Sequence, residues 1–126
     1  MVGIILSLKP WWWRMISRGE KTVEIRKTIP HAGMPFKVFV YETKHQGRGA
    51  IVGEFTVKRF WSEYRNKDGG ISGLTLAEIL DYGNGKAYGW EISDVMAYAN
   101  PINLQEFGLV RPPQSWCYSK SGGKTN

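Results

Sequence analysis

The sequence LKPWWWRMISRGEKTVEIRK, residues Leu8 to Lys27, predicts three consecutive structural elements. Pro10 suits the first turn of a helix, because its missing N–H would have no partner there, and we expect residues 11–17 to be helical. Gly19 is a natural end for that helix. In the segment TVEIR, residues 22–26, apolar and polar side chains alternate with the period of a β-strand. The stretch therefore predicts a helix, a turn and a strand.

The segments around this stretch add further strands and helices. Thr75 and Glu78 form a capping-box pattern at the start of TLAEIL and predict a second helix there. NLQEFG, residues 103–108, predicts one short helical turn. β-Branched and aromatic residues predict further strands, over residues 2–8, 37–43, 50–61, 87–93, 95–102 and 115–119.

The order of these elements indicates the fold class. The short strands follow one another with few helices between them, so the alternating βαβ pattern is absent. We therefore expect a mainly β protein with peripheral helices (α+β), built on a closed or nearly closed antiparallel or mixed β-barrel of five to six strands. The length of 126 residues fits one domain. We expect that domain to span residues 1–119, followed by a disordered tail over residues 120–126.

Positive charge is concentrated in the first half of the chain. Residues 1–67 hold 13 Lys or Arg against 5 Asp or Glu, whereas residues 68–126 hold 4 against 6. A basic half beside a mildly acidic half produces a directed field that attracts phosphates. Nucleic acid is therefore the first expected partner and an anionic membrane surface the second. The alternative is a basic surface that serves only solubility.

Several classes of protein are excluded by composition. A single cysteine, Cys117, cannot form an internal disulfide, which fits a reducing, cytoplasmic setting. His31 and His45 have no Cys, His or carboxylate neighbour at the spacing of a metal site, so we expect neither a metal nor a cofactor. No stretch approaches the roughly 18 apolar residues of a membrane span, and the start does not have the pattern of a signal peptide. A monomer is favoured over an oligomer.

Lys21, Glu24 and Arg26 are the first candidate site. Glu24 and Arg26 lie two positions apart on the expected strand, so both side chains project from the same face. Such a group could be a structural ion-pair cluster, which is the commonest outcome. It could instead bind a polar ligand, with Glu24 accepting from base amino groups and the cations contacting phosphate or carbonyl oxygens. It could also perform acid–base chemistry, with Glu24 as the base.

The tryptophan run is the second candidate site. If residues 11–17 are helical, the three indoles point about 100° apart, so part of the cluster packs in the core and at least one ring is exposed. Exposed aromatic rings among cations form a stacking platform for unpaired bases. The candidate nucleic-acid-binding residues are Lys9, Trp11, Trp12, Arg14, Lys21, Glu24, Arg26, Lys27 and Lys44.

Together these segments resemble the ASCH-domain family of the PUA-like superfamily, in particular its small single-domain bacterial and phage members. The family hallmark is matched by Gly19, Lys21, Glu24 and Arg26. The resemblance runs in order from about Ile4 to Tyr118, through KPWW, VFVYET, VGEFTV, YGWEISDV and RPPQSWCY. It implies a PUA-like barrel whose cleft, containing the hallmark Lys and Glu, binds single-stranded RNA or a nucleotide or nucleoside ligand.

Two enzymatic branches of the family offer alternatives. Some ASCH-like proteins are amidohydrolases of acylated cytidine that use Lys, Thr and Glu. Here Lys21 matches, but Glu24 stands at the threonine position and no carboxylate stands near Ser72, which argues against that mechanism. Other ASCH proteins cleave single-stranded RNA through a Tyr, a Lys and a Ser, for which Tyr41, Lys44 and Ser115 are the possible counterparts.

We therefore expect a metal-independent RNA- or nucleotide-binding module with a basic cleft. The alternative is a ribonuclease or nucleoside amidohydrolase using the same cleft. In that case the catalytic residues would come from Lys21, Glu24, Tyr41, Lys44 and Ser115. A third possibility is a protein-interaction module with an acidic target.

Overall fold

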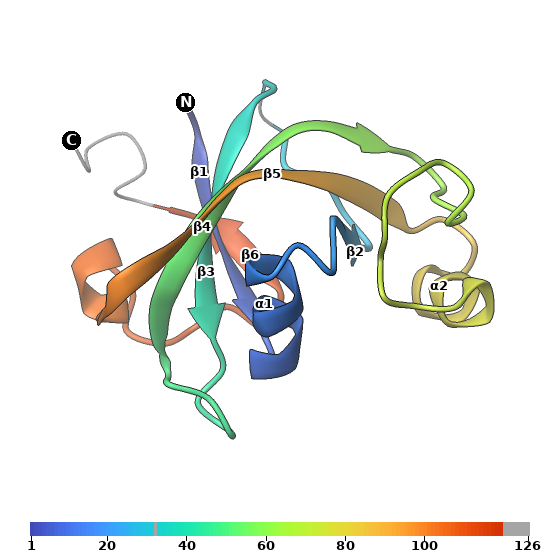
Figure 1. Cartoon of the computed structure of the whole chain (residues 1–126). Helices are drawn as coiled ribbons and strands as arrows, with labels where there is room; N and C mark the ends of the chain where they lie inside the picture. Colours follow the sequence, from blue (N-terminus) through green and yellow to red (C-terminus); the bar gives the residue numbers. More distant parts are fainter. Residues whose placement is uncertain (32, 120–126) are drawn as a thin grey trace.

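The computed structural model describes residues 1–31 and 33–119. Its body is one curled sheet of six strands in the order β2-β5-β4-β3-β1-β6 (Figure 1). The strands are β1 Gly3–Leu8, β2 Val23–Arg26, β3 Phe36–Glu42, β4 Ala50–Trp61, β5 Tyr88–Ile102 and β6 Trp116–Tyr118. The helices are α1 Pro10–Ser17, α2 Leu76–Gly83 and the 3-10 helix η1 Leu104–Phe107.

The sheet is mixed, as expected for the fold class. β1 and β3 pair in parallel, and the other four pairings are antiparallel. The parallel pair arises because α1 and β2 lie between β1 and β3 in the chain and return it to the same end of the sheet. The result is a curled half-barrel with helices at its periphery (Figure 1). The prediction of a mainly β protein with peripheral helices is confirmed.

The largest core cluster lies between α1 and the inner face of the sheet. Trp13 and Ile16 of α1 are 4% and 1% exposed, and they pack on apolar residues of β1, β3 and β4. Gly53 permits this approach, because a Cβ at that position would collide with the Trp13 ring and with the carbonyl oxygen of Met96. α1 is thereby held against the sheet, with its remaining faces toward solvent and the site.

A second cluster joins β2 to α2. Val23 and Ile25 pack with Tyr64, Ile79 and Ala87, so the apolar face of β2 is turned toward the α2 region. Because side chains alternate along a strand, Glu24 and Arg26 project from the opposite face. The predicted division of this strand is confirmed. The capping box predicted at the start of α2 is also present.

The C-terminal half contains one strand where two were expected. Residues 88–102 form the single strand β5, whereas the sequence predicted separate strands over 87–93 and 95–102. Asp94 adopts a positive φ of 51°, and the register with β4 shifts near this position. A bulge inserts an extra residue and bends a strand without ending it, which explains the difference. The predicted tail, residues 120–126, lies outside the described residues.

Side chains span the gap between the two edge strands, β2 and β6. Trp116 Nε1 donates to Thr28 Oγ1 at 2.9 Å. The backbone N–H of His31 donates to the Tyr118 hydroxyl at 2.8 Å. These two contacts and the hydrogen bond of Arg26 with Ser115 place β6 beside the candidate site.

Candidate functional site

α1 presents its three tryptophans to three different environments. Trp13 is buried in the core, Trp11 is 41% exposed, and Trp12 is half-buried. Lys9 Nζ lies 5.2 Å from the centre of the Trp11 ring, a cation–π contact. Adjacent helix residues point about 100° apart, so the three rings cannot share one face. The prediction that the tryptophan cluster is divided between core and surface is confirmed.

Lys21 and Glu24 form a buried ion pair beside α1. The two residues are 3% and 4% exposed, and Lys21 Nζ lies 3.4 Å from Glu24 Oε1. The same ammonium donates to the carbonyl oxygens of Val23 at 2.9 Å and Ser72 at 2.5 Å. An ammonium has three donors, and all three are directed at protein atoms. Lys21 therefore ties β2 to the segment that precedes α2.

Burial and charge act on Lys21 in opposite directions. Desolvation by burial lowers the pKa of its ammonium, the carboxylate of Glu24 raises it, and the nearby Arg26 lowers it again. The ammonium also lies 4.7 Å from the centre of the Trp12 ring, whose π face favours a cation. The Glu24 carboxylate and the Trp12 ring thus favour the charged form, which burial alone would oppose.

Arg26 extends this cluster to the C-terminal segment. Its Nε donates to Glu24 Oε2 at 2.8 Å, and its Nη1 donates to Ser115 Oγ at 2.9 Å. Its Nη2 donates to the carbonyl oxygen of Ser7 at 3.3 Å. The planar guanidinium therefore holds a carboxylate and a hydroxyl in fixed positions on either side. Residues far apart in the sequence meet at this side chain.

A small cleft of about 250 Å³ opens over the cluster. Trp12 from α1 forms one part of its wall, and Leu74 and Tyr82 from the α2 region form another. At its rim, Lys27 Nζ lies 5.0 Å from the centre of the Tyr82 ring. The lining residues are Trp12, Lys21, Glu24, Ile25, Arg26, Leu74 and Tyr82. The cleft thus combines a buried carboxylate and two cations with aromatic side chains.

Comparison with known proteins relates both the sequence and the fold to an ASCH-domain protein. The sequence is 29% identical to an ASCH domain-containing ribonuclease of Zymomonas mobilis, over an alignment of 125 residues that covers 88% of this chain and 80% of the relative. The crystal structure of ASCH from Zymomonas mobilis matches with a TM-score of 0.77 and 25% identity, covering 97% of this chain and 91% of that one. No family model matches the sequence.

Crystal structures of two variants of the same protein give similar matches. A serine-to-alanine variant has a TM-score of 0.77 at 24% identity, and covers 95% of this chain and 89% of the other. A tyrosine-to-phenylalanine variant has a TM-score of 0.75 at 24% identity, with 95% and 91% covered. In sequence and in fold, the chain is similar to ASCH-domain proteins. The sequence resemblance is confirmed in this respect.

The residues that match the ASCH hallmark lie in and beside the cleft. Gly19 has a positive φ of 75°, a conformation that favours glycine, and it ends α1 so that the chain can turn into β2. Lys21, Glu24 and Arg26 then line the cleft. Ser115 joins them through its hydrogen bond with Arg26.

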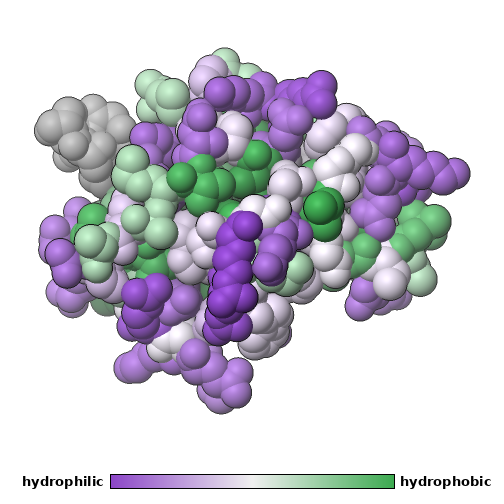
Figure 2. Space-filling model, viewed as in Figure 1, coloured by the Kyte–Doolittle hydropathy of each residue, from purple (hydrophilic) through white to green (hydrophobic). Residues whose placement is uncertain are grey.

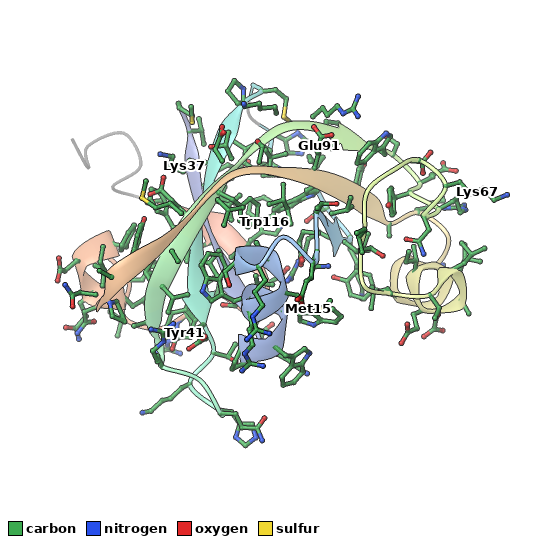
Figure 3. All side chains as sticks on the ribbon, in the orientation of Figure 1. Met15, Lys37, Tyr41, Lys67, Glu91 and Trp116 are labelled. Atoms are coloured by element: carbon green, nitrogen blue, oxygen red, sulfur yellow. The ribbon has the colours of Figure 1, made fainter. Side chains whose placement is uncertain are left out.

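The other candidate residues lie outside the cleft lining. Tyr41 is 5% exposed and packs in a separate cluster with Leu104 and Phe107 of η1. Figure 3 shows Tyr41 beside the lower part of the sheet, apart from Met15 at the cleft side of α1. Four candidate cations are exposed and do not line the cleft: Lys9, Arg14, Lys27 and Lys44. The structure therefore brings Ser115 to the cluster but not Tyr41 or Lys44.

Sequence reasoning missed Leu74 and Tyr82. Both come from the α2 region, more than 45 residues after the hallmark glutamate. α2 reaches β2 only because Ile79 packs with Val23 and Ile25. Tyr82 is 37% exposed, and an exposed aromatic residue on a short helix was the only available signal.

A second polar network lies on the outer face of the sheet, beside a hollow of about 600 Å³. Lys37 Nζ lies 2.7 Å from Glu54 Oε2, and the Tyr98 hydroxyl donates to Glu54 Oε1 at 2.6 Å. In Figure 3, Lys37 lies near the upper part of the sheet, away from Met15 on α1. Burial raises the pKa of Glu54, but the hydrogen bonds from Lys37 and Tyr98 outweigh it, so the net shift is downward.

Stability is therefore expected to depend on Glu54 in acid. A carboxyl group whose folded pKa is lowered stabilises the fold above its unfolded pKa of about 4.5, and this contribution is lost as the pH falls through the lower folded value. Urea unfolding between pH 7 and pH 3 checks this in the wild type and Glu54→Gln. The variant should lose less stability over that range. Equal losses in the two proteins would contradict the assignment.

Among residues 1–31 and 33–119, no group of three His, Cys, Asp or Glu side chains converges to hold a metal ion. Within the same residues, no helix is both long and apolar enough to cross a membrane.

Proposed function

We propose that this ASCH domain binds single-stranded RNA and takes one unpaired base into the cleft. The observation that carries the proposal is the buried carboxylate of Glu24, held between Lys21 and Arg26 in the cleft that Trp12 also lines. A carboxylate has about four lone-pair positions, and two are occupied by these cations. The remaining positions can accept hydrogen bonds from the N–H groups of a base edge.

The size and walls of the cleft support a base as the occupant. Its volume of about 250 Å³ is below the ~300–1,000 Å³ of pockets for drug-sized ligands. Trp12 and Tyr82 offer aromatic surfaces, and stacking on such rings is worth about 1–3 kcal/mol per base. A nucleotide or nucleoside could occupy the same space, and it would use the same contacts.

In this proposal, the exposed cations and Lys21 have different tasks. Lys21 directs its donors at protein atoms, so it shapes the cleft. The exposed Lys9, Arg14, Lys27 and Lys44 attract the phosphates. The relative that is an ASCH domain-containing ribonuclease also supports an RNA-directed function for this chain.

Binding should weaken steeply with salt. For single strands, log K falls with log salt by about 0.7 for each phosphate contact, so three to five contacts give a slope of roughly −2 to −3.5. The affinity for a labelled, unstructured RNA decamer is measured by fluorescence anisotropy. The salt concentration is varied from about 25 to about 300 mM, a range over which the screening length changes strongly. No binding at low salt, or an affinity that is independent of salt, would overturn the proposal.

Cleavage of the bound RNA is the second candidate function. The similarity to an ASCH domain-containing ribonuclease favours it, as does the chain of contacts from Glu24 through Arg26 to the Ser115 hydroxyl. Glu24 would remove the proton of a 2′-hydroxyl, whose oxygen attacks the adjacent phosphorus. The bond to the 5′-oxygen breaks, that oxygen takes up a proton from solvent, and Arg26 stabilises the negative charge that develops on the phosphoryl oxygens.

One assay separates binding from the two hydrolytic alternatives. The protein is incubated with chelator and either labelled RNA or acylated nucleosides. RNA fragments that are absent with Glu24→Gln and Ser115→Ala support a ribonuclease. Deacylated nucleosides support an amidohydrolase, although the Ser72 carbonyl oxygen binds Lys21 where that mechanism needs a carboxylate. If all substrates stay intact and RNA is still bound, the protein is a binding module without either activity on these substrates.

A further inference from the structure

A second hollow, of about 550 Å³, lies between α1 and the β3–β4 connection. α1 lies beside the hairpin that follows Glu42 (Figure 1), and both contribute lining residues. The lining residues are Pro10, Trp13, Arg14, Ser17, Glu42, Gln46, Gly47, Arg48 and Ala97. We call this hollow the hairpin groove.

The hairpin groove and the cleft lie on different sides of α1. Trp12 points into the cleft, whereas the groove is lined by residues 10, 13, 14 and 17 of the same helix. At 100° per residue, the centre of this second set is roughly 150° from Trp12 around the helix axis. Trp11 and Arg18 fall on the arc between them that faces solvent, since Trp13 and Ile16 occupy the buried arc.

The groove is basic and partly preorganised. Arg48 Nε lies 3.2 Å from Glu42 Oε1, and the Arg48 backbone N–H donates to the same oxygen at 2.8 Å. Glu42 is 6% exposed, so a buried carboxylate holds the Arg48 side chain and its loop in place. Arg14 makes no ion pair with any residue in 1–31 or 33–119, and its guanidinium is exposed. The two arginines outnumber the single carboxylate.

The surface between the two sites is suitable for a single strand. Trp11 is exposed on this arc and has Lys9 over its ring, and Arg18 is exposed at the helix end. Figure 2 shows hydrophilic side chains gathered over α1 and the hairpin below it. Exposed aromatic rings with flanking cations bind single strands by stacking and phosphate contacts.

We propose that the hairpin groove binds the phosphates of an RNA strand whose base occupies the cleft, with the intervening nucleotides crossing the exposed face of α1. This inference rests on the proposed RNA binding. Arg14 and Arg48 are the phosphate ligands, and Trp11 stacks an intervening base. A helix with its side chains is about 10–12 Å wide, so the exposed arc of roughly 210° is about 18–22 Å long. Stacked nucleotides advance about 3.4 Å each, so a ligand must be about six nucleotides or longer to reach both sites.

The test compares two double variants on two ligands. Arg14→Ala/Arg48→Ala removes the groove cations. Lys58→Ala/Arg59→Ala removes the same charge at the other end of β4 and serves as the matched control. The ligands are a labelled RNA decamer and a nucleoside monophosphate, and each affinity is measured over a series of salt concentrations.

For the decamer, the groove variant should lower the magnitude of the salt slope by about 1.4, which is two contacts of about 0.7 each. The control pair should leave the slope unchanged, and both variants should bind the monophosphate as the wild type does. Arg14→Ala alone, which breaks no ion pair among the described residues, should lower the slope by about 0.7. This single variant keeps the test informative if loss of Arg48 disturbs Glu42.

Three results would overturn the inference. The first is an unchanged decamer slope in the groove variant, and the second is an equal loss in the control pair. The third is an equal loss for the monophosphate. If the wild type binds no RNA at any salt concentration, the proposed function fails as well. If the wild type binds and only the cleft variant Glu24→Gln is impaired, the function stands and the groove does not contribute.

Discussion

Replacing Lys21 by alanine is expected to lower the free energy of unfolding by about 3–5 kcal/mol, the usual cost of breaking a buried ion pair. The ammonium holds Glu24, Val23 and Ser72 at once. Without it, two carbonyl oxygens lose their donor and Glu24 keeps only Arg26 as a charged partner. The Trp12 ring also loses the cation that lies 4.7 Å from its centre.

Urea unfolding followed by tryptophan fluorescence measures this change. Lys27→Ala is the matched control, because Lys27 is an exposed lysine whose ring contact with Tyr82 is worth at most about 1 kcal/mol. The double variant Lys21→Met/Glu24→Gln should cost less than the sum of its two single variants, since the two residues interact directly. A loss below about 1 kcal/mol for Lys21→Ala would show that the pair behaves as an exposed one.

The Lys21 result also bears on how hallmark lysines are interpreted. Sequence spacing placed Lys21, Glu24 and Arg26 together correctly, because side chains two apart on a strand share a face. Spacing could not indicate that the ammonium donates to Ser72, 51 residues later in the chain. That contact depends on how the segment before α2 packs. A lysine that looked available for phosphate is therefore engaged within the protein.

Local patterns predicted most of the fold. The alternation in residues 22–26 and the capping box at Thr75 act within a few residues, so sequence alone is sufficient for them. Asp94 shows what local patterns cannot decide. A residue that readily adopts a positive φ is typical both of a turn between two strands and of a bulge within one strand. The structure of β5 depends on its pairing with β4 over many residues. Such long-range pairing has no local signature.

The same distinction applies to the site. Trp12 and Glu24 come from neighbouring elements and were both predicted. Tyr82 reaches the cleft only through the packing of Ile79 on the apolar face of β2. The hairpin groove likewise requires α1 to lie beside residues 42–48, which follow it by about 30 positions. Each site therefore combines residues from neighbouring elements with residues that tertiary packing brings close. Only the residues from neighbouring elements could be predicted.

Glu24→Gln is expected to weaken binding of a single-stranded RNA decamer by about 10- to 100-fold, since hydrogen bonds to a charged group contribute roughly 1.5–3 kcal/mol. The amide keeps the shape of the side chain but removes the charge, and it offers one acceptor oxygen where the carboxylate offers two. Its NH₂ group must also lie near Lys21 or Arg26, neither of which can accept a hydrogen bond. The variant should therefore bind a base less tightly, and the cleft should be less well ordered.

The measurement must separate recognition from folding. Anisotropy titrations are run where urea curves show that the variant is fully folded. Glu20→Gln is the control, because Glu20 is an exposed carboxylate in the preceding turn and the substitution changes the net charge equally. Glu20→Gln should bind slightly more tightly or as the wild type does, because it only makes the chain more basic.

The pattern across binding and cleavage then identifies the role of Glu24. Weaker binding without any cleavage in the wild type supports base recognition alone. Unchanged binding together with lost cleavage of labelled RNA assigns Glu24 as the general base, because the amide cannot accept the 2′-hydroxyl proton. If the wild type never cleaves RNA and Glu24→Gln binds RNA as tightly as the wild type does, Glu24 has no part in RNA binding. The proposed function would then fail, because it depends on the buried carboxylate.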